Sequence, residues 1–357
     1  MKKTLCIILA LVMVLGMAAC GQSAAPAAPA APAESAAPAP AEPAAVPAPA
    51  EPAAEPIVLR YASVYTQSST YGQAMEKFKS IVEEKSNGGM IIDCFYDAAL
   101  GAESDMIQSQ KEGGIEIAFS AASGIGLYVE ATQILEAWYA YEDVQGVKSL
   151  FESIMDELDA AYQEQGFKLI GAFYDGYRNI LAKKPITSLA DMKGLKMRSP
   201  TNAMFSGSIE ALGAQAVAMP LSDVYTSLQT GAIEACEGTL DTIYTNKFYE
   251  QAKCLIWDSH VWTPFSVTMN LDAWNALTAE QQQIIMDASA EASAYQVELF
   301  NEFAMKELDE MKAAGLEVYE LTDRPDWVAA VSDHVFSLAQ QYGELGVKIY
   351  EAQKAAQ

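Results

Sequence analysis

The chain has 357 residues, of which 22 are lysine or arginine and 47 are aspartate or glutamate, so its formal net charge is −25 at pH 7. An acidic protein of this kind repels phosphate backbones, which excludes nucleic-acid binding as its main function. A site that binds an anion within such a chain therefore needs positive charge of its own.

The first twenty residues have the features of an exported precursor. Two lysines follow the initial methionine, and the apolar run over 5–15 is too short for a comfortable membrane span. The sequence MAAC at 17–20 resembles a bacterial lipobox, with methionine where leucine is usual. We expect a lipoprotein signal peptide over 1–19 and lipidation of Cys20, which would anchor the protein outside the cytoplasm. The alternative is an ordinary signal peptide cleaved nearby.

A tether is predicted over 20–56. Beyond the cysteine it consists almost entirely of alanine and proline, with scattered glutamates. It has too few large apolar side chains to pack a core, and proline favours extended polyproline II structure. We expect a stiff spacer, which leaves about 300 residues for two lobes with cores of their own.

The segment after the tether has the pattern of alternating strands and helices. Strands are predicted over 57–63, 90–96 and 114–120, and helices over 70–86 and 103–112. This order builds parallel sheets, whose ligands lie outside the carboxyl ends of the strands. Tyr65, in the first strand-to-helix loop, either faces the ligand or packs in the core. Glu103 is expected to provide the negative charge that a helix N-terminus favours.

Small and aromatic residues dominate the next part. The loop over 120–126 brings backbone close to a partner, but it is not a dinucleotide fingerprint, because the third glycine is missing. Trp138 begins an aromatic segment that either lines a cleft or packs in the core. A helix is predicted over 143–165 and a strand over 167–174, and Arg178 follows that strand.

The stretch 183–246 contains the strand-helix order twice. A strand over 194–199 stops at a proline and is followed by a helix that ends at Gly213. A second strand over 215–219 also stops at a proline, and its helix ends at Gly231. Side chains that cap helix N-termini stand where these helices begin: Thr201 or Asn202, and Ser222 or Asp223.

Arginine is scarce, and two of its positions point to carboxylate binding. The four arginines are Arg60, Arg178, Arg198 and Arg324. Arg178 and Arg198 each lie beside the end of a predicted strand. A guanidinium presents a planar fork of donors that matches a carboxylate in two hydrogen bonds, which lysine cannot do. The alternative is that both arginines form structural salt bridges with the abundant acids.

A long helix dominates the last part of the chain. Strands are predicted over 253–260, 264–270 and 316–321, and a helical tail from residue 325. The helical pattern over 279–314 begins with Thr278 as cap and Gln281 three residues later, a capping box. At 1.5 Å per residue this helix is about 54 Å long, which is enough to connect two lobes.

No catalytic or metal-binding pattern is present in the sequence. It has no GxSxG, Walker A or HExxH motif, and its two histidines offer few candidates for a histidine-based triad. We therefore predict no enzyme activity, no cofactor and no metal. Outside the predicted signal and Cys20, three cysteines remain, Cys94, Cys236 and Cys254, and we expect free thiols, although the last two are able to bridge.

Several pieces of the sequence together resemble one family. They are KGLKMRSP at 193–200, EALGA at 210–214, AMPLSDVYTSLQTGAIEACE at 218–237 and KFYE at 247–250. In this order and spacing they are similar to the solute-binding proteins of TRAP (tripartite ATP-independent periplasmic) transporters of the DctP type. The resemblance extends over roughly 57–350.

The resemblance implies an α/β, two-lobed, periplasmic-binding-protein-like (type II) fold with a central ligand cleft and a long lobe-spanning helix. The expected lobes are 57–175 plus 264–303 and 176–263 plus 304–357. The implied function is capture of a small carboxylate and its delivery to TRAP membrane subunits, by a monomer that touches the membrane only through its lipid. The rival functions are service to a sensor or an ABC-type importer, or a surface-anchored enzyme, which would need a nucleophile-base pair.

The resemblance also assigns site residues. Arg198 would clamp the ligand carboxylate in two bonds, Arg178 would be a second contact, and Tyr65 and Trp138 would line the cleft. Leu221, Glu237 and Gly238 complete the assigned site. Leu221 replaces an aromatic residue that is common in relatives, and Gly238, which follows Glu237, replaces an asparagine that often touches the ligand. Ala121 or Ala122 stands where several relatives have an acid. These departures predict a carboxylate ligand with a less polar body.

Overall fold

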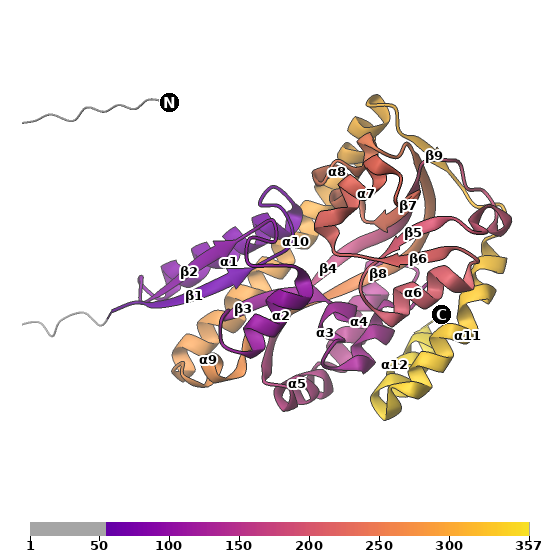
Figure 1. Cartoon of the computed structure of the whole chain (residues 1–357). Coiled ribbons are helices and arrows are strands. Elements are labelled where there is room, and N and C mark those ends of the chain that lie inside the picture. Colours follow the sequence, from indigo (N-terminus) through magenta and orange to yellow (C-terminus); the bar gives the residue numbers. More distant parts are fainter. Residues whose placement is uncertain (1–54, 357) are drawn as a thin grey trace, which may run out of the picture. The chain divides into compact units, whose positions relative to one another are not determined.

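The computed structural model describes residues 55–356, so the predicted signal peptide, Cys20 and nearly all of the predicted tether lie outside the described residues. The described strands form one mixed sheet of nine strands in the order β2-β1-β3-β8-β4-β7-β5-β6, with β9 paired to β8 (Figure 1). Their bounds are β1 (Ile57–Ala62), β2 (Met90–Phe95), β3 (Ile117–Ala121), β4 (Phe167–Ala182), β5 (Lys196–Ser199), β6 (Gln215–Ala218), β7 (Ala235–Gly238), β8 (Cys254–Asn270) and β9 (Glu317–Tyr319).

Helices cover this sheet. The α-helices are α1 (Thr70–Lys85), α2 (Glu103–Lys111), α3 (Ala122–Ile125), α4 (Val144–Ser153), α5 (Met155–Glu164), α6 (Ala203–Ala211), α7 (Val224–Thr230), α8 (Leu240–Thr245), α9 (Leu271–Asn275), α10 (Ala279–Ala313), α11 (Arg324–Gln341) and α12 (Gly343–Ala356). Short 3-10 turns are η1 (Glu130–Glu136), η2 (Leu189–Met192), η3 (Leu221–Asp223) and η4 (Phe248–Glu250). No helix within 55–356 is both long and apolar enough to cross a membrane.

Several helix ends lie where capping residues predict them. The Asn202 side chain accepts the N–H of Phe205 at the start of α6, and the predicted capping box of Thr278 and Gln281 begins α10. Gly213 follows the end of α6 with φ +87°, a left-handed conformation that glycine adopts without strain. These predictions are confirmed.

The strands β4 and β8 are longer than predicted. A strand ending at residue 174 and two separate strands over 253–260 and 264–270 were expected, but β4 and β8 each continue through those breaks as one antiparallel pair. The register shifts between Tyr174 and Tyr177, opposite Pro264 and Trp262. A bulge of this kind bends a strand without ending it, so residues that usually signal a turn are accommodated here.

The two halves of this long pair belong to different parts of the sheet. The first half of β4 pairs with the second half of β8, which also pairs with β3, whereas the end of β4 pairs with β7. Accordingly, we propose that the lobes divide near the bulge, and we retain 57–175 plus 264–303 and 176–263 plus 304–357 as their proposed bounds.

Helix α10 contributes to two separate hydrophobic cores. Ile285 and Ala292 pack with side chains of α1 and β1, whereas Leu308 and Met311 pack with side chains of α7 and α8. Figure 1 shows α10, in orange, running past β4 between these groups. The predicted helix over 279–314 is thus confirmed, and it connects both cores.

Two predicted helices are interrupted. The helix expected over 143–165 is α4 and α5, separated at Ile154, and the C-terminal tail is α11 and α12, separated at Tyr342. Gly343 follows with φ +74°, which turns the chain. Helix α11 packs on α6, while α12 packs on η1 and α4, so the C-terminal helices contact segments from both proposed lobes.

Candidate functional site

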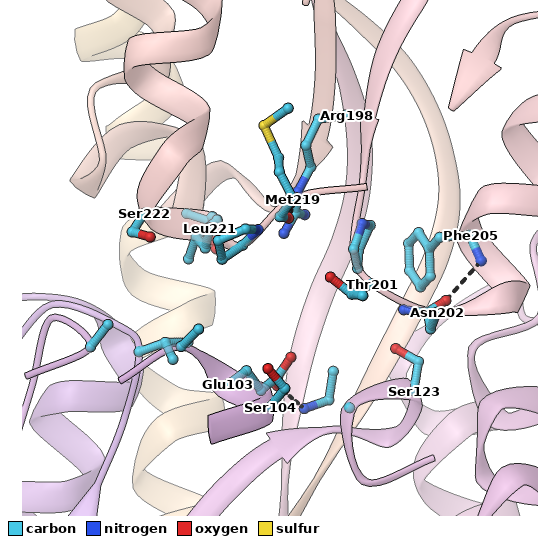
Figure 2. A pocket seen from close by; sticks show the side chains of 18 of the residues that line it. Glu103, Ser104, Ser123, Arg198, Thr201, Asn202, Phe205, Met219, Leu221 and Ser222 are labelled. Atoms are coloured by element: carbon cyan, nitrogen blue, oxygen red, sulfur yellow. Dashed lines mark hydrogen bonds between the residues drawn. The ribbon is translucent and has the colours of Figure 1, made fainter. Parts of the chain in front are cut away.

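A cavity of about 850 Å³, including its open mouth, lies where several strands end. Its walls include the segments that follow β1, β3, β5 and β6, such as Tyr65, Ser123, Asn202 and Leu221. This is the position at which sheets with parallel strands hold ligands. Figure 2 shows Arg198 and Met219 on one side of the cavity and Glu103 and Ser104 on the facing side.

Arg178, which lines this cavity, forms a buried, two-pronged ion pair with Glu237, which does not. Nε and Nη2 of Arg178 donate to the two carboxylate oxygens of Glu237 at 2.5 Å and 2.8 Å. The side chains are 7% and 0% exposed. Burial acts to lower the pKa of Arg178, but the charge and hydrogen bonds of Glu237 outweigh it and raise that pKa. The pair is therefore fully ionised.

Arg198 is held more loosely. Its Nε donates to the carbonyl oxygen of Met219 at 3.2 Å, and its Nη1 lies 3.4 Å from Oε1 of Glu237. Burial and the charge of Arg178 lower the pKa of Arg198, although Glu237 opposes them. One carboxylate thus serves two guanidinium groups. Among the described residues, no hydrogen bond engages Nη1 of Arg178 or Nη2 of Arg198.

A histidine supports the same carboxylate from behind. Nδ1 of His260 lies 2.9 Å from Oδ2 of Asp258, and its Nε2 lies 3.6 Å from Oε2 of Glu237. The ring of Trp138 covers the imidazole, with ring centroids 4.1 Å apart. Burial acts to lower the pKa of His260, but the two carboxylates outweigh it and raise that pKa.

This raised pKa predicts how stability depends on pH. The stabilisation from protonated His260 is fully present below the unfolded value of 6.5 and is lost as pH rises through the higher folded pKa. We expect the free energy of unfolding to fall above pH 6.5 with a slope of up to about 1.4 kcal/mol per pH unit. Urea unfolding of the parent and of His260→Gln across pH 6.5–9 checks this. Equal slopes in the two proteins would contradict it.

Two carboxylates form the facing part of the wall. Oε1 of Glu103, on α2, accepts the N–H of Ala121 at 3.1 Å, and Oε2 of Glu136, at the end of η1, accepts the N–H of Ser123 at 2.5 Å. Burial and the neighbouring Glu136 raise the pKa of Glu103 to about 7, although the hydrogen bond from Ala121 and the charges of the two arginines act to lower it. Burial likewise raises the pKa of Glu136.

The prediction of a ligand with a less polar body rests partly on the absence of an acid at Ala121 and Ala122. Glu103 supplies an acid to the same loop from another helix, so this absence no longer favours a less polar ligand. Serines, threonines and an asparagine line the cavity together with apolar side chains such as Met219 and Leu221. Glu103 does stand in the first turn of α2, as expected, but its carboxylate is directed to the neighbouring loop.

The structure brings only part of the predicted site set to the cavity. Tyr65, Leu221 and both arginines line it, whereas Glu237 and Gly238 lie behind the arginines on β7 and are absent from its lining. Trp138 lines a second cavity of about 370 Å³ beneath α11 and α12. Glu136, Asn202 and Phe205 also line the cavity, and no sequence pattern marked them as site residues.

Phe205 connects some of these groups. Its ring lies 5.3 Å from the guanidinium carbon of Arg178, and its centroid lies 5.9 Å from that of Trp138. Trp138 therefore contacts the site through Phe205 and His260. The three remaining cysteines are free, and no cluster of three or more metal-ligating side chains occurs among residues 55–356.

Comparison with known proteins gives consistent matches. The model of the family described as bacterial extracellular solute-binding protein, family 7 (DctP), matches residues 61–340. The 2,3-diketo-L-gulonate-binding periplasmic protein YiaO of Escherichia coli is 29% identical, over 78% of this chain and 85% of its own length. The C4-dicarboxylate-binding periplasmic protein DctP of Rhodobacter capsulatus is 25% identical, over 84% and 91%.

Solved structures share the fold. The sugar acid binding protein DctPAm of Advenella mimigardefordensis, in complex with galactonate, superposes with a TM-score of 0.81 at 25% identity, over 85% of this chain and 99% of that one. The predicted α/β two-lobed fold is confirmed by this likeness.

Proposed function

We propose, because the chain belongs to the DctP family of bacterial extracellular solute-binding proteins, that it captures a small organic carboxylate outside the cytoplasm and delivers it to TRAP-type membrane subunits. The similar proteins bind a keto sugar acid, C4-dicarboxylates and galactonate, according to their names. Their shared feature is a carboxylate group on a small, polar body.

The observation that carries this proposal is the unequal pairing of the two buried arginines. Glu237 compensates Arg178 closely but lies 3.4 Å from Arg198, whose pKa burial and Arg178 lower. A ligand carboxylate would supply the missing negative charge and would accept from the unused nitrogens of both guanidinium groups. Closure of the lobes would follow, because the bound ligand adds contacts to both sides of the cavity.

The remaining parts of the proposal concern location and assembly. A lipid on Cys20 would anchor the protein after removal of 1–19, and the proline-rich segment would hold a monomeric binding domain above the membrane. We propose binding without turnover. Neither histidine lines the cavity, which supports this, since a nucleophile there would have no imidazole base.

The test is ligand-dependent thermal stability of the full chain. We expect D-galactonate, D-galacturonate or succinate at 1 mM to raise the melting temperature, because a ligand that binds only the folded state stabilises it. Galactitol, which has the hydroxyls of galactonate but no carboxylate, is the matched control and should have no effect. A shift with galactitol as large as that with galactonate, or no shift with any acid, would contradict carboxylate capture.

A further inference from the structure

We propose that Glu103 is a specificity-determining residue that accepts hydrogen bonds from ligand hydroxyls and disfavours a second ligand carboxylate, so that the ligand is a hydroxylated monocarboxylic acid. This inference rests on the proposed function, since it assumes that the arginine side of the cavity receives the ligand carboxylate. It adds the chemistry of the other end of the ligand.

The position of Glu103 is fixed by the elements around it. Its carboxylate accepts the N–H of Ala121, at the end of β3, and lies against Gly124 in α3. A methyl group at Gly124 would lie 2.7 Å from the carboxyl carbon of Glu103, so the absence of a side chain there leaves the space that the acid occupies. The carboxylate is therefore held at the wall of the cavity and does not extend into solvent.

The two sides of the cavity have opposite hydrogen-bonding character. Arg178 and Arg198 are donors only, whereas an ionised carboxylate such as that of Glu103 is an acceptor only. Oε1 of Glu136, a second acid in the lining, is buried and has no hydrogen-bond partner among residues 55–356. A ligand that satisfies both sides needs an acceptor at one end and O–H donors at the other, which a sugar acid has.

A dicarboxylate fits this arrangement less well. Its second carboxylate would meet Glu103 and Glu136, and two carboxylates in close contact cannot both stay ionised. Protonation of Glu103 would relieve the repulsion. The charged groups that act on Glu103 are Glu136 on η1, Arg178 on β4 and Arg198 on β5, and its pKa of about 7 places its titration in an accessible range.

Calorimetric titration of the full chain with D-galactonate and succinate at pH 6 and pH 8 tests the proposal. We expect galactonate to bind at least tenfold more tightly than succinate at pH 8, and the preference to shrink several-fold at pH 6, where Glu103 takes up a proton. In Glu103→Gln, succinate should gain about tenfold at pH 8, galactonate should lose about tenfold, and the pH dependence of the ratio should become at least several-fold smaller, with Glu136 as the remaining acid.

Asp105→Asn is the matched control, because Asp105 is an exposed acid in the same first turn of α2. It should leave the ratio of the two affinities unchanged. The titrations of the parent at two pH values use no variant, so they test the proposal even if Glu103→Gln does not fold. Equal pH dependence for both ligands, or succinate binding that exceeds galactonate binding in the parent, would overturn it while leaving carboxylate capture intact. Failure of every acid to bind would overturn both.

Discussion

Replacing Arg178 by methionine is expected to lower the free energy of unfolding of the ligand-free protein by about 3–5 kcal/mol. Methionine keeps most of the length of the side chain but leaves Glu237, which is 0% exposed, without its two charged hydrogen bonds. Arg198 at 3.4 Å and His260 at 3.6 Å stay beside the carboxylate, but both contacts are longer than the two hydrogen bonds that are lost. The loss is large because a buried carboxylate left with only these longer contacts is poorly solvated in the low-dielectric interior.

The matched control lies at the protein surface. Arg60 pairs with Glu116 in the same two-pronged geometry, at 2.9 Å and 2.6 Å, but the two side chains are 40% and 17% exposed. Arg60→Met should cost about 1 kcal/mol or less, since water screens the exposed pair. Urea unfolding measures both losses. Equal losses for the two variants would show that burial does not increase the contribution of the Arg178 pair to stability.

A second variant separates the lost pair from lost packing. Adding Glu237→Gln to Arg178→Met removes the buried negative charge that has lost its main partner. The double variant should therefore be more stable than the sum of the single losses predicts, by about 1–3 kcal/mol.

The loss in free energy of unfolding caused by Arg178→Met alone should also become smaller as pH falls below 4.5. Glu237 has a lowered pKa in the folded parent, so its stabilisation is present above the unfolded value of 4.5 and is lost as pH falls below it.

Local backbone rules made much of the second half of the sheet predictable. Glycines with positive φ end α6 and α7, and Asn202 caps α6, because these residues satisfy helix ends in any context. The long helix α10 was predictable for the same reason, from its capping box and its unbroken pattern. Such signals depend on neighbours in the sequence and need no knowledge of the tertiary fold.

The composition of the site was only partly predictable, because its contacts join distant residues. Arg178 and Glu237 are 59 residues apart, and their pairing follows from the register of β4 against β7. Glu103 was interpreted as a helix-terminal charge, since nothing near it in sequence indicates that α2 directs its carboxylate to the loop after β3. The acid at this wall of the pocket was missed on that account, whereas the scarcity of arginine drew attention to Arg178 and Arg198, which both line the cavity.

Replacing Arg198 by alanine is expected to weaken the binding of D-galactonate at least a hundredfold while changing ligand-free stability by no more than about 1 kcal/mol. The affinity falls because this guanidinium has the unused Nη2 and a charge that Glu237 compensates only in part. Stability changes little because the loss of its contacts with Met219 and Glu237 is offset by removal of the desolvation cost of a buried guanidinium and of its repulsion from Arg178.

Arg198→Lys distinguishes the guanidinium group from the charge alone. Lysine keeps the positive charge, but its single nitrogen cannot contact Met219 and Glu237 and also present a fixed donor to the ligand, so we expect an intermediate loss of about tenfold. Calorimetric titration measures the three affinities, and urea unfolding without ligand measures the stabilities. If alanine binds galactonate within threefold of the parent, Arg198 is a structural residue and the carboxylate is bound elsewhere. If alanine and lysine weaken binding equally, the fixed orientation of the guanidinium group accounts for the whole contribution of this residue, and the positive charge at this position by itself attracts no ligand.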